Sequence, residues 1–108
     1  MSETLSRLQA LAAAGLYRIS DHAYQKLAER GILPTLVVSS LANAVVVEDY
    51  PDAARGPTVL LLMRDKDGEA LHALWEIPRD GPNIAVLITA YRPDPQQWTH
   101  SSMKRSEP

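Results

Sequence analysis

Three side chains of this sequence are suited to moving protons, namely His22, His72 and Tyr91. An imidazole titrates near neutral pH, and a phenol can act as a proton donor or bind phosphate. His22 directly follows a capping position at a predicted helix start, where the helix dipole favours the neutral ring that a general base requires. His72 and Tyr91 fall in predicted strands. The three residues are therefore candidates for acid–base chemistry, with His22 as a general base, His72 as the second candidate and Tyr91 as an acid or a phosphate contact.

Four basic residues accompany this set and predict contacts with phosphate, namely Lys26, Arg30, Arg64 and Arg92. Lys26 and Arg30 follow His22 at one and two helical turns, so the three share one edge of a helix. The position of Arg64 relative to His72 depends on the register of the two strands. If Asp67-Gly68 is a two-residue turn, Met63 faces His72 and Arg64 lies one residue further along the partner strand.

Structural interpretations of the same residues stay open. His22 can belong to a solvated polar helix face, and His72 can be a half-buried strand residue with a hydrogen bond. Tyr91 can be a buried sheet aromatic, and Arg92 can pair with a nearby carboxylate. Trp75 alternates with apolar neighbours and is predicted to lie in the core.

Composition excludes several classes of site. The chain has 108 residues, no cysteine and a net charge of −2. Thiolate metal ligands and cysteine nucleophiles are therefore absent, and a large nucleic-acid surface is disfavoured, although a small basic site is not. The histidines are spread along the chain without metal-ligand spacing, and there is no glycine-rich phosphate loop. We expect neither a metal nor a cofactor.

No apolar run is long enough to span a bilayer, so no membrane partner is expected. The segment 11–16 resembles the apolar part of a signal peptide, but it is short and carries helical spacing. We therefore expect a helix there and retention in the cytoplasm.

Periodicity predicts an α+β domain with two or three N-terminal helices on one face of a roughly four-stranded antiparallel sheet. Helices are expected after Ser2, from Ser20 or Asp21 to about Arg30, and over 34–41. Residues 17–19 are too short to assign and read as an extended link or a brief strand. A run from Ala44, then 58–64, 71–77 and 84–91, follows as a meander of strands. A single domain is expected over 1–98, followed by a flexible tail over 99–108.

Several segments together resemble a small bacterial family, the domain of unknown function family DUF4258. The matching segments are Tyr17-Arg18-Ile19-Ser20-Asp21-His22-Ala23, Glu29-Arg30-Gly31-Ile32, Glu48-Asp49-Tyr50-Pro51-Asp52, Arg55-Gly56-Pro57, Leu71-His72 and Thr89-Ala90-Tyr91-Arg92-Pro93-Asp94-Pro95 ending at Trp98. The family-like core is thus 17–98. The third predicted helix departs from the family because it lacks opening acidic residues.

The family is in turn similar to the RelE/ParE-like toxins, many of which are ribosome-dependent RNA endonucleases. That resemblance implies a RelE-like fold, a cleft on the open sheet face and metal-independent cleavage of RNA. His72 and Tyr91 would be the acid and base, and Arg64 and Arg92 would stabilise the phosphate. The implied partners are RNA or the ribosome, together with an antitoxin protein.

A different class of function fits the same sequence. A non-catalytic module could use this fold to bind a protein partner or to form a homodimer, and the apolar residues Leu36, Val37 and Val38 favour that interpretation. A third interpretation is that Asp21, His22 and Arg30 only hold the second helix on the sheet.

Overall fold

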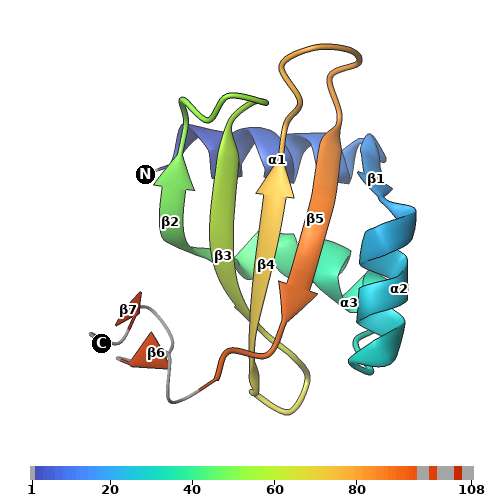
Figure 1. Cartoon of the computed structure of the whole chain (residues 1–108), viewed down its shortest axis with the longest axis vertical. Coiled ribbons are helices and arrows are strands. Elements are labelled where there is room, and N and C mark those ends of the chain that lie inside the picture. Colours follow the sequence, from blue (N-terminus) through green and yellow to red (C-terminus); the bar gives the residue numbers. More distant parts are fainter. Residues whose placement is uncertain (1, 95–97, 100–103, 106–108) are drawn as a thin grey trace.

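The computed structural model describes residues 2–94, 98–99 and 104–105. Helices α1 (Glu3–Ala13), α2 (Asp21–Glu29) and α3 (Pro34–Ser39) are followed by a short 3-10 helix, η1 (Ser40–Asn43). The main sheet contains β1 (Tyr17–Ile19), β2 (Val45–Tyr50), β3 (Thr58–Arg64), β4 (Ala70–Glu76) and β5 (Ala85–Tyr91). In Figure 1, α1 and α3 lie behind this sheet and α2 lies beside β5, so the predicted α+β fold is confirmed.

The predicted helix ends follow the local chemistry. The hydroxyl oxygens of Ser2 and Ser20 accept hydrogen bonds from the backbone N–H groups of Leu5 and Ala23, each at 3.1 Å, which satisfies otherwise unpaired donors of the first turn. Pro34 occupies the first turn of α3, where its missing N–H costs no helical hydrogen bond. Helix α2 buries Ala23 and Leu27 against the core, whereas Tyr24 is 51% exposed.

The sheet contains one more strand than the predicted meander. Strands β2 to β5 are antiparallel neighbours as expected, and the order is β1-β5-β4-β3-β2. Strand β1 pairs with β5 in parallel, with Tyr17 opposite Ala85. The N–H of Ala85 also donates to the carbonyl of Leu16 at 3.0 Å. The segment 17–19 is therefore a strand, and the sheet is mixed.

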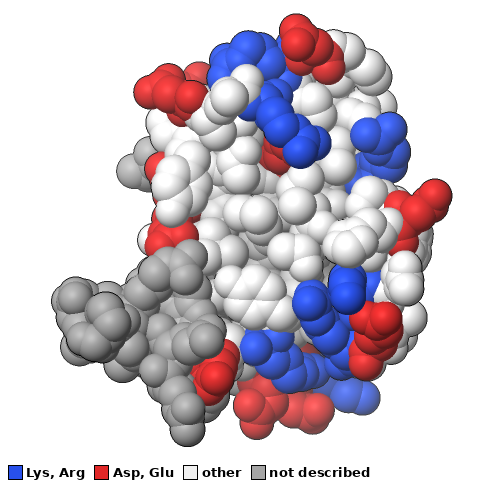
Figure 2. Space-filling view, viewed as in Figure 1, with Lys and Arg blue, Asp and Glu red and all other residues white. Residues whose placement is uncertain are grey.

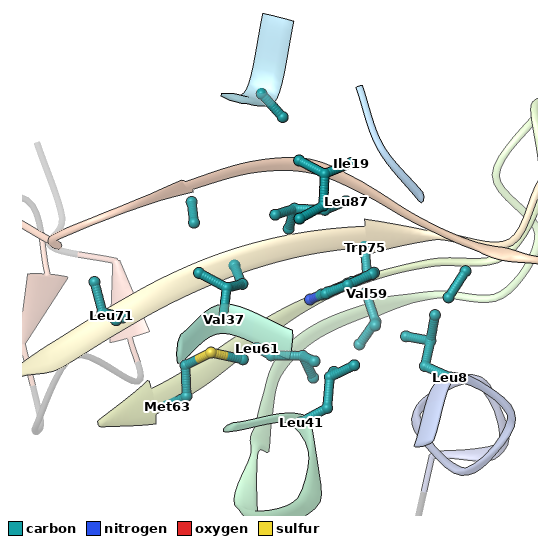
Figure 3. Close-up of a cluster of buried hydrophobic side chains, with 14 of the residues drawn as sticks. Leu8, Ile19, Val37, Leu41, Val59, Leu61, Met63, Leu71, Trp75 and Leu87 are labelled. Atoms are coloured by element: carbon teal, nitrogen blue, oxygen red, sulfur yellow. The ribbon is translucent and has the colours of Figure 1, made fainter. Parts of the chain in front are cut away.

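The core fills the space between the helices and one face of the sheet. Figure 3 shows side chains of β3, β4 and β5 meeting those of α1, α3 and η1, with Trp75 among them. Trp75 is fully buried, as predicted, and its indole N–H has no hydrogen-bond partner among the described residues. Val37 is also fully buried, and Leu36 and Val38 pack against the same core. Val37 is thus a core residue and is not available to a partner, whereas Leu36 and Val38 are half-buried. A partner surface on α3 stays a prediction for these two residues.

The tail falls mostly outside the described residues. Its described parts, β6 (Trp98–Thr99) and β7 (Lys104–Arg105), pair antiparallel with Trp98 opposite Arg105. The other residues of the tail lie outside the described residues, so the flexibility expected for 99–108 stays a prediction.

At the end of the sheet where β2 and β4 finish, the loop after β2 is attached to the loop after β4 around Gly56. The N–H groups of Ile77 and Arg79 donate to the carbonyls of Pro57 and Arg55 at 2.9 and 2.8 Å. Gly56 has a φ of +144°, and a Cβ there would collide with the carbonyl of Ile77 and lie 2.8 Å from the nitrogen of Arg79. Only glycine fits this backbone contact.

We predict that Gly56→Ala lowers the free energy of unfolding by more than about 2 kcal/mol, because the backbone of two loops must move apart. Chemical denaturation measures this change. Gly15→Ala is the matched control, since Gly15 has a φ of +76° but open space around its Cβ position, and we expect it to cost about 1 kcal/mol. Equal losses in the two variants would contradict the role of Gly56.

Candidate functional site

His72 and Tyr91 lie directly opposite each other on β4 and β5. The Nδ1 atom of His72 is 3.4 Å from the hydroxyl oxygen of Tyr91, and the two rings meet edge to face with centroids 5.4 Å apart. His72 is fully buried, whereas Tyr91 is partly exposed. The sheet thus brings the two predicted catalytic residues together, with the imidazole behind the phenol.

The turn before His72 differs from the predicted two-residue hairpin. The N–H of Gly68 donates to the carbonyl of Asp65 at 3.0 Å, and the N–H of Asp65 donates to the carbonyl of Glu69 at 3.0 Å. With Gly68 at a φ of +79°, the loop contains three residues, 66–68. The predicted register is therefore wrong by one residue: Leu62, not Met63, faces His72.

This change of register moves Arg64 to the face that carries His72. Arg64 pairs with Ala70, so it lies diagonally across from His72 on the same side of the sheet. Such diagonal neighbours have Cα atoms about 7–8 Å apart, within reach of a long side chain. The Nη1 atom of Arg64 donates to the carbonyl of Gly68 at 3.1 Å, which directs the guanidinium toward the hairpin.

Asp65 holds the hairpin loop and Arg92 together, and the sequence analysis did not identify this residue as a candidate. Its Oδ1 accepts hydrogen bonds from the backbone N–H groups of Asp67 and Glu69, both at 2.9 Å. Its Oδ2 pairs with Nη1 of Arg92 at 3.1 Å. The Asp65-Lys66-Asp67-Gly68 motif was a sufficient signal, because an aspartate at the start of a turn commonly accepts bonds from the following backbone.

These contacts hold the pKa of the Asp65 carboxyl below its ordinary value. The backbone N–H of Glu69 has the largest effect; burial opposes it, and the N–H of Asp67 and the Arg92 guanidinium lower the pKa further. Hydrogen bonds to the charged form favour that form.

Arg92 and Arg30 both lie beside Tyr91. Arg92 follows Tyr91 in the chain, and its side chain remains 46% exposed while it pairs with Asp65. Arg30, at the C-terminus of α2, donates through Nη1 to the carbonyl of Ala90 at 2.8 Å and to the hydroxyl of Thr89 at 3.1 Å. Arg30 therefore holds α2 on the part of β5 that β1 does not cover. This agrees with the interpretation that Arg30 holds the second helix on the sheet.

Each of the three arginines uses only one terminal nitrogen in these contacts. For Arg30, Arg64 and Arg92, the remaining guanidinium N–H groups have no hydrogen-bond partner within the described part of the chain. A guanidinium fixed through one nitrogen can still offer its other donors to a phosphate.

His22 and Lys26 do not join this group. His22 is exposed near the N-terminus of α2, eight residues before Arg30, which places it about 12 Å away along the helix axis. Lys26 pairs with Glu29 at 3.3 Å on the helix surface. The predicted edge of His22, Lys26 and Arg30 is exposed, but only Arg30 reaches the sheet.

The open face of the sheet is uncharged at its centre and carries charges of both signs at its ends. Figure 2 shows basic side chains next to acidic ones near the ends of the strands, with a broad uncharged area between them. At the end away from Tyr91, Nε of Arg55 lies 3.4 Å from Oε1 of the buried Glu76. This mixture agrees with a small basic site rather than an extended basic surface.

The described residues contain no group of histidine, aspartate and glutamate side chains that could hold a metal ion. They also contain no helix long and apolar enough to cross a membrane.

The family model described as a domain of unknown function, DUF4258, matches residues 19–92. Neither a curated protein nor a solved structure matches the chain. The likeness to the RelE/ParE toxins that the sequence suggested has no support from these comparisons.

The lowered pKa of Asp65 predicts a defined pH dependence of stability. A carboxyl whose folded pKa is depressed stabilises the fold above its unfolded pKa, and this contribution disappears as pH falls through the folded pKa. Asp65→Asn should therefore be less stable than the parent at neutral pH, and the difference should shrink on acidification through the titration range below 3.8.

Urea denaturation of both proteins across this pH range measures the difference. Asp67→Asn is the matched control, because the turn uses the backbone N–H of Asp67 and not its carboxylate. A stability difference between the parent and Asp65→Asn that does not change with pH would contradict the assigned ion pair and turn contacts.

Proposed function

Since the chain belongs to the DUF4258 family, whose description states no activity, we propose a function from the chain's own geometry: metal-independent cleavage of RNA at Tyr91. The observation that carries this proposal is the contact between the buried His72 and the partly exposed Tyr91. Arg30 is bonded to the carbonyl of the adjacent Ala90, and Arg64 is diagonal to His72 on the same face of the sheet. A small basic site of this kind is compatible with a net charge of −2.

The different burial of His72 and Tyr91 gives the two residues different roles. His72 has no exposed surface, so Tyr91 is the residue that touches the RNA. His72 is a positioning residue that orients the phenol and accepts its proton. Edge-to-face packing of the rings and the cross-strand pairing restrict the motion of Tyr91, which favours a preorganised site.

The proposed reaction is an internal transesterification. The 2′-hydroxyl oxygen of a ribose forms a bond to the adjacent phosphorus, and the bond from phosphorus to the 5′-oxygen breaks. Tyr91 takes the 2′-hydroxyl proton as its own phenolic proton moves to His72, and the leaving 5′-oxygen takes a proton from water. The products are a cyclic phosphate and a 5′-hydroxyl end.

Arginine donors stabilise the charge that develops on the phosphate oxygens. Arg30 is held on the carbonyl of Ala90, the residue before Tyr91. Arg92 follows Tyr91 and is held on Asp65, and Arg64 is held on the carbonyl of Gly68 in the hairpin. Their Nη1 contacts fix the three guanidiniums before substrate binds, so little reorganisation is needed during the reaction.

A non-catalytic protein-binding module remains the second candidate. The observation that favours it is the edge strand β2, on which Val45 and Tyr50 are 52% and 47% exposed. This edge does not require His72 or Tyr91 to react.

We predict that Tyr91→Phe lowers the rate of RNA cleavage at least about 100-fold, because the phenolic oxygen that exchanges protons is lost. The assay uses purified protein, a single-stranded RNA and EDTA, and identifies the cyclic phosphate on the product. His72→Gln should lower the rate and change its pH profile, because His72 acts through Tyr91. Tyr24→Phe, which alters an exposed tyrosine on α2, should cleave at the parental rate.

Thermal unfolding of all variants checks that each one folds. Cleavage by Tyr91→Phe at the parental rate, or complete loss of the parent's activity in EDTA, would contradict the proposed mechanism.

The toxin expectation leads to a cellular prediction. Controlled induction of the parent chain in bacteria should arrest growth, and Tyr91→Phe expressed at an equal level should relieve the arrest because cleavage is lost. Equal growth with both chains would argue against an autonomous toxin and would favour the protein-binding candidate.

A further inference from the structure

Strand β2 forms an edge of the main sheet and pairs only with β3 among the described strands. It is six residues long, and two of its large hydrophobic side chains, Val45 and Tyr50, are about half exposed. Edge strands offer backbone N–H and C=O groups to an added strand. Proteins that bind extended peptides commonly use such an edge.

A bulge at Val47 arranges the side chains of β2 in two sets. Val46 and Asp49 lie opposite Leu61 and Val59, which are core residues, so both point toward the helices. On the other face, the hydroxyl of Tyr50 donates to a carboxylate oxygen of Glu48 at 2.8 Å. A strand added at this edge would therefore meet a carboxylate on each face of the sheet.

A groove of about 600 Å³ lies on the helix side of this edge. Its described lining comes from α1 and β2 and comprises Ser2, Leu5, Ser6, Gln9, Val45, Val46 and Asp49. The side chain of Asp49 is the single charged group among these lining residues, so the groove carries negative charge on a surface that is otherwise apolar or polar without charge. Alternate side chains of an added strand would enter it.

We propose that β2 binds an extended basic segment of a partner protein, which joins the sheet as an additional strand. Lysine or arginine side chains of that segment would enter the groove and pair with Asp49. The alternate, apolar side chains of the segment would lie on the other face of the sheet and pack on Val45 and Tyr50, which lie opposite Leu62 and Thr58. Complementary charge favours this partner, because Asp49 in the groove repels acidic peptides and the phosphates of nucleic acids or lipids.

Charge also disfavours a second copy of the chain as the occupant. Two β2 strands related by a two-fold axis would bring Glu48 and Asp49 of both copies onto one ladder. Like charges directly across a strand pair destabilise the pairing. Sedimentation experiments should therefore show no dimer that depends on β2.

The test uses two short synthetic peptides, one of alternating lysine and valine and one of alternating glutamate and valine. Backbone amide NMR of the full chain should show saturable shifts over 45–50 with the lysine peptide and much smaller shifts with the glutamate peptide. Asp49→Lys should weaken binding of the lysine peptide about tenfold or more and strengthen binding of the glutamate peptide.

Asp67→Lys is the matched control, because it makes the same charge change on the exposed hairpin far along the sequence from β2. It should bind the lysine peptide as the parent does. Equal binding of both peptides by the parent, equal weakening by the two variants, or shifts located away from 45–50 would overturn the proposal. A dimer of the chain alone that Asp49→Lys alters would also overturn it.

Discussion

The carboxylate of Asp65 is the group on which the arrangement of the candidate site depends. Through Oδ1 it holds the three-residue loop between β3 and β4, and through Oδ2 it holds Arg92 at the end of β5. The loop sets the register that places Leu62 opposite His72 and Arg64 on the same face. One half-buried carboxylate thus joins the hairpin to the strand that carries Tyr91.

Local chemistry made much of the fold predictable from the sequence. The caps at Ser2 and Ser20 and the hydrophobic strand runs act over a few residues, so they identify the helices and the four antiparallel strands. The parallel pairing of Tyr17 with Ala85 was not predictable, because it joins distant segments through only three residue pairs. The hairpin sequence allowed both a two-residue and a three-residue loop, and the side chain of Asp65 selects between them. The same difference between local and long-range information applies to the candidate site. The sequence placed His72 and Tyr91 in strands, but only the pairing of β4 with β5 shows that they lie opposite each other.

The arginines near Tyr91 combine support of the fold with donors for a ligand. Arg30, Arg64 and Arg92 each attach one structural element, namely the end of α2, the hairpin loop and the end of β5. These contacts explain how a chain with a slightly acidic balance concentrates guanidiniums at one end of a sheet. Acidic residues lie among them, so the positive field is local, and it falls within about 10 Å at moderate salt. The substrate that we propose is therefore a short stretch of RNA rather than a long duplex.

The most direct test of the central assignment is an NMR titration of the full chain with a short single-stranded RNA that carries 2′-O-methyl groups and so cannot be cleaved. If the open sheet face binds RNA, the largest shifts will occur at Tyr91 and at the side chains of Arg30, Arg64 and Arg92. The shifts should weaken as salt is raised. An absence of shifts at these residues, or shifts confined to β2, would contradict an RNA site at Tyr91.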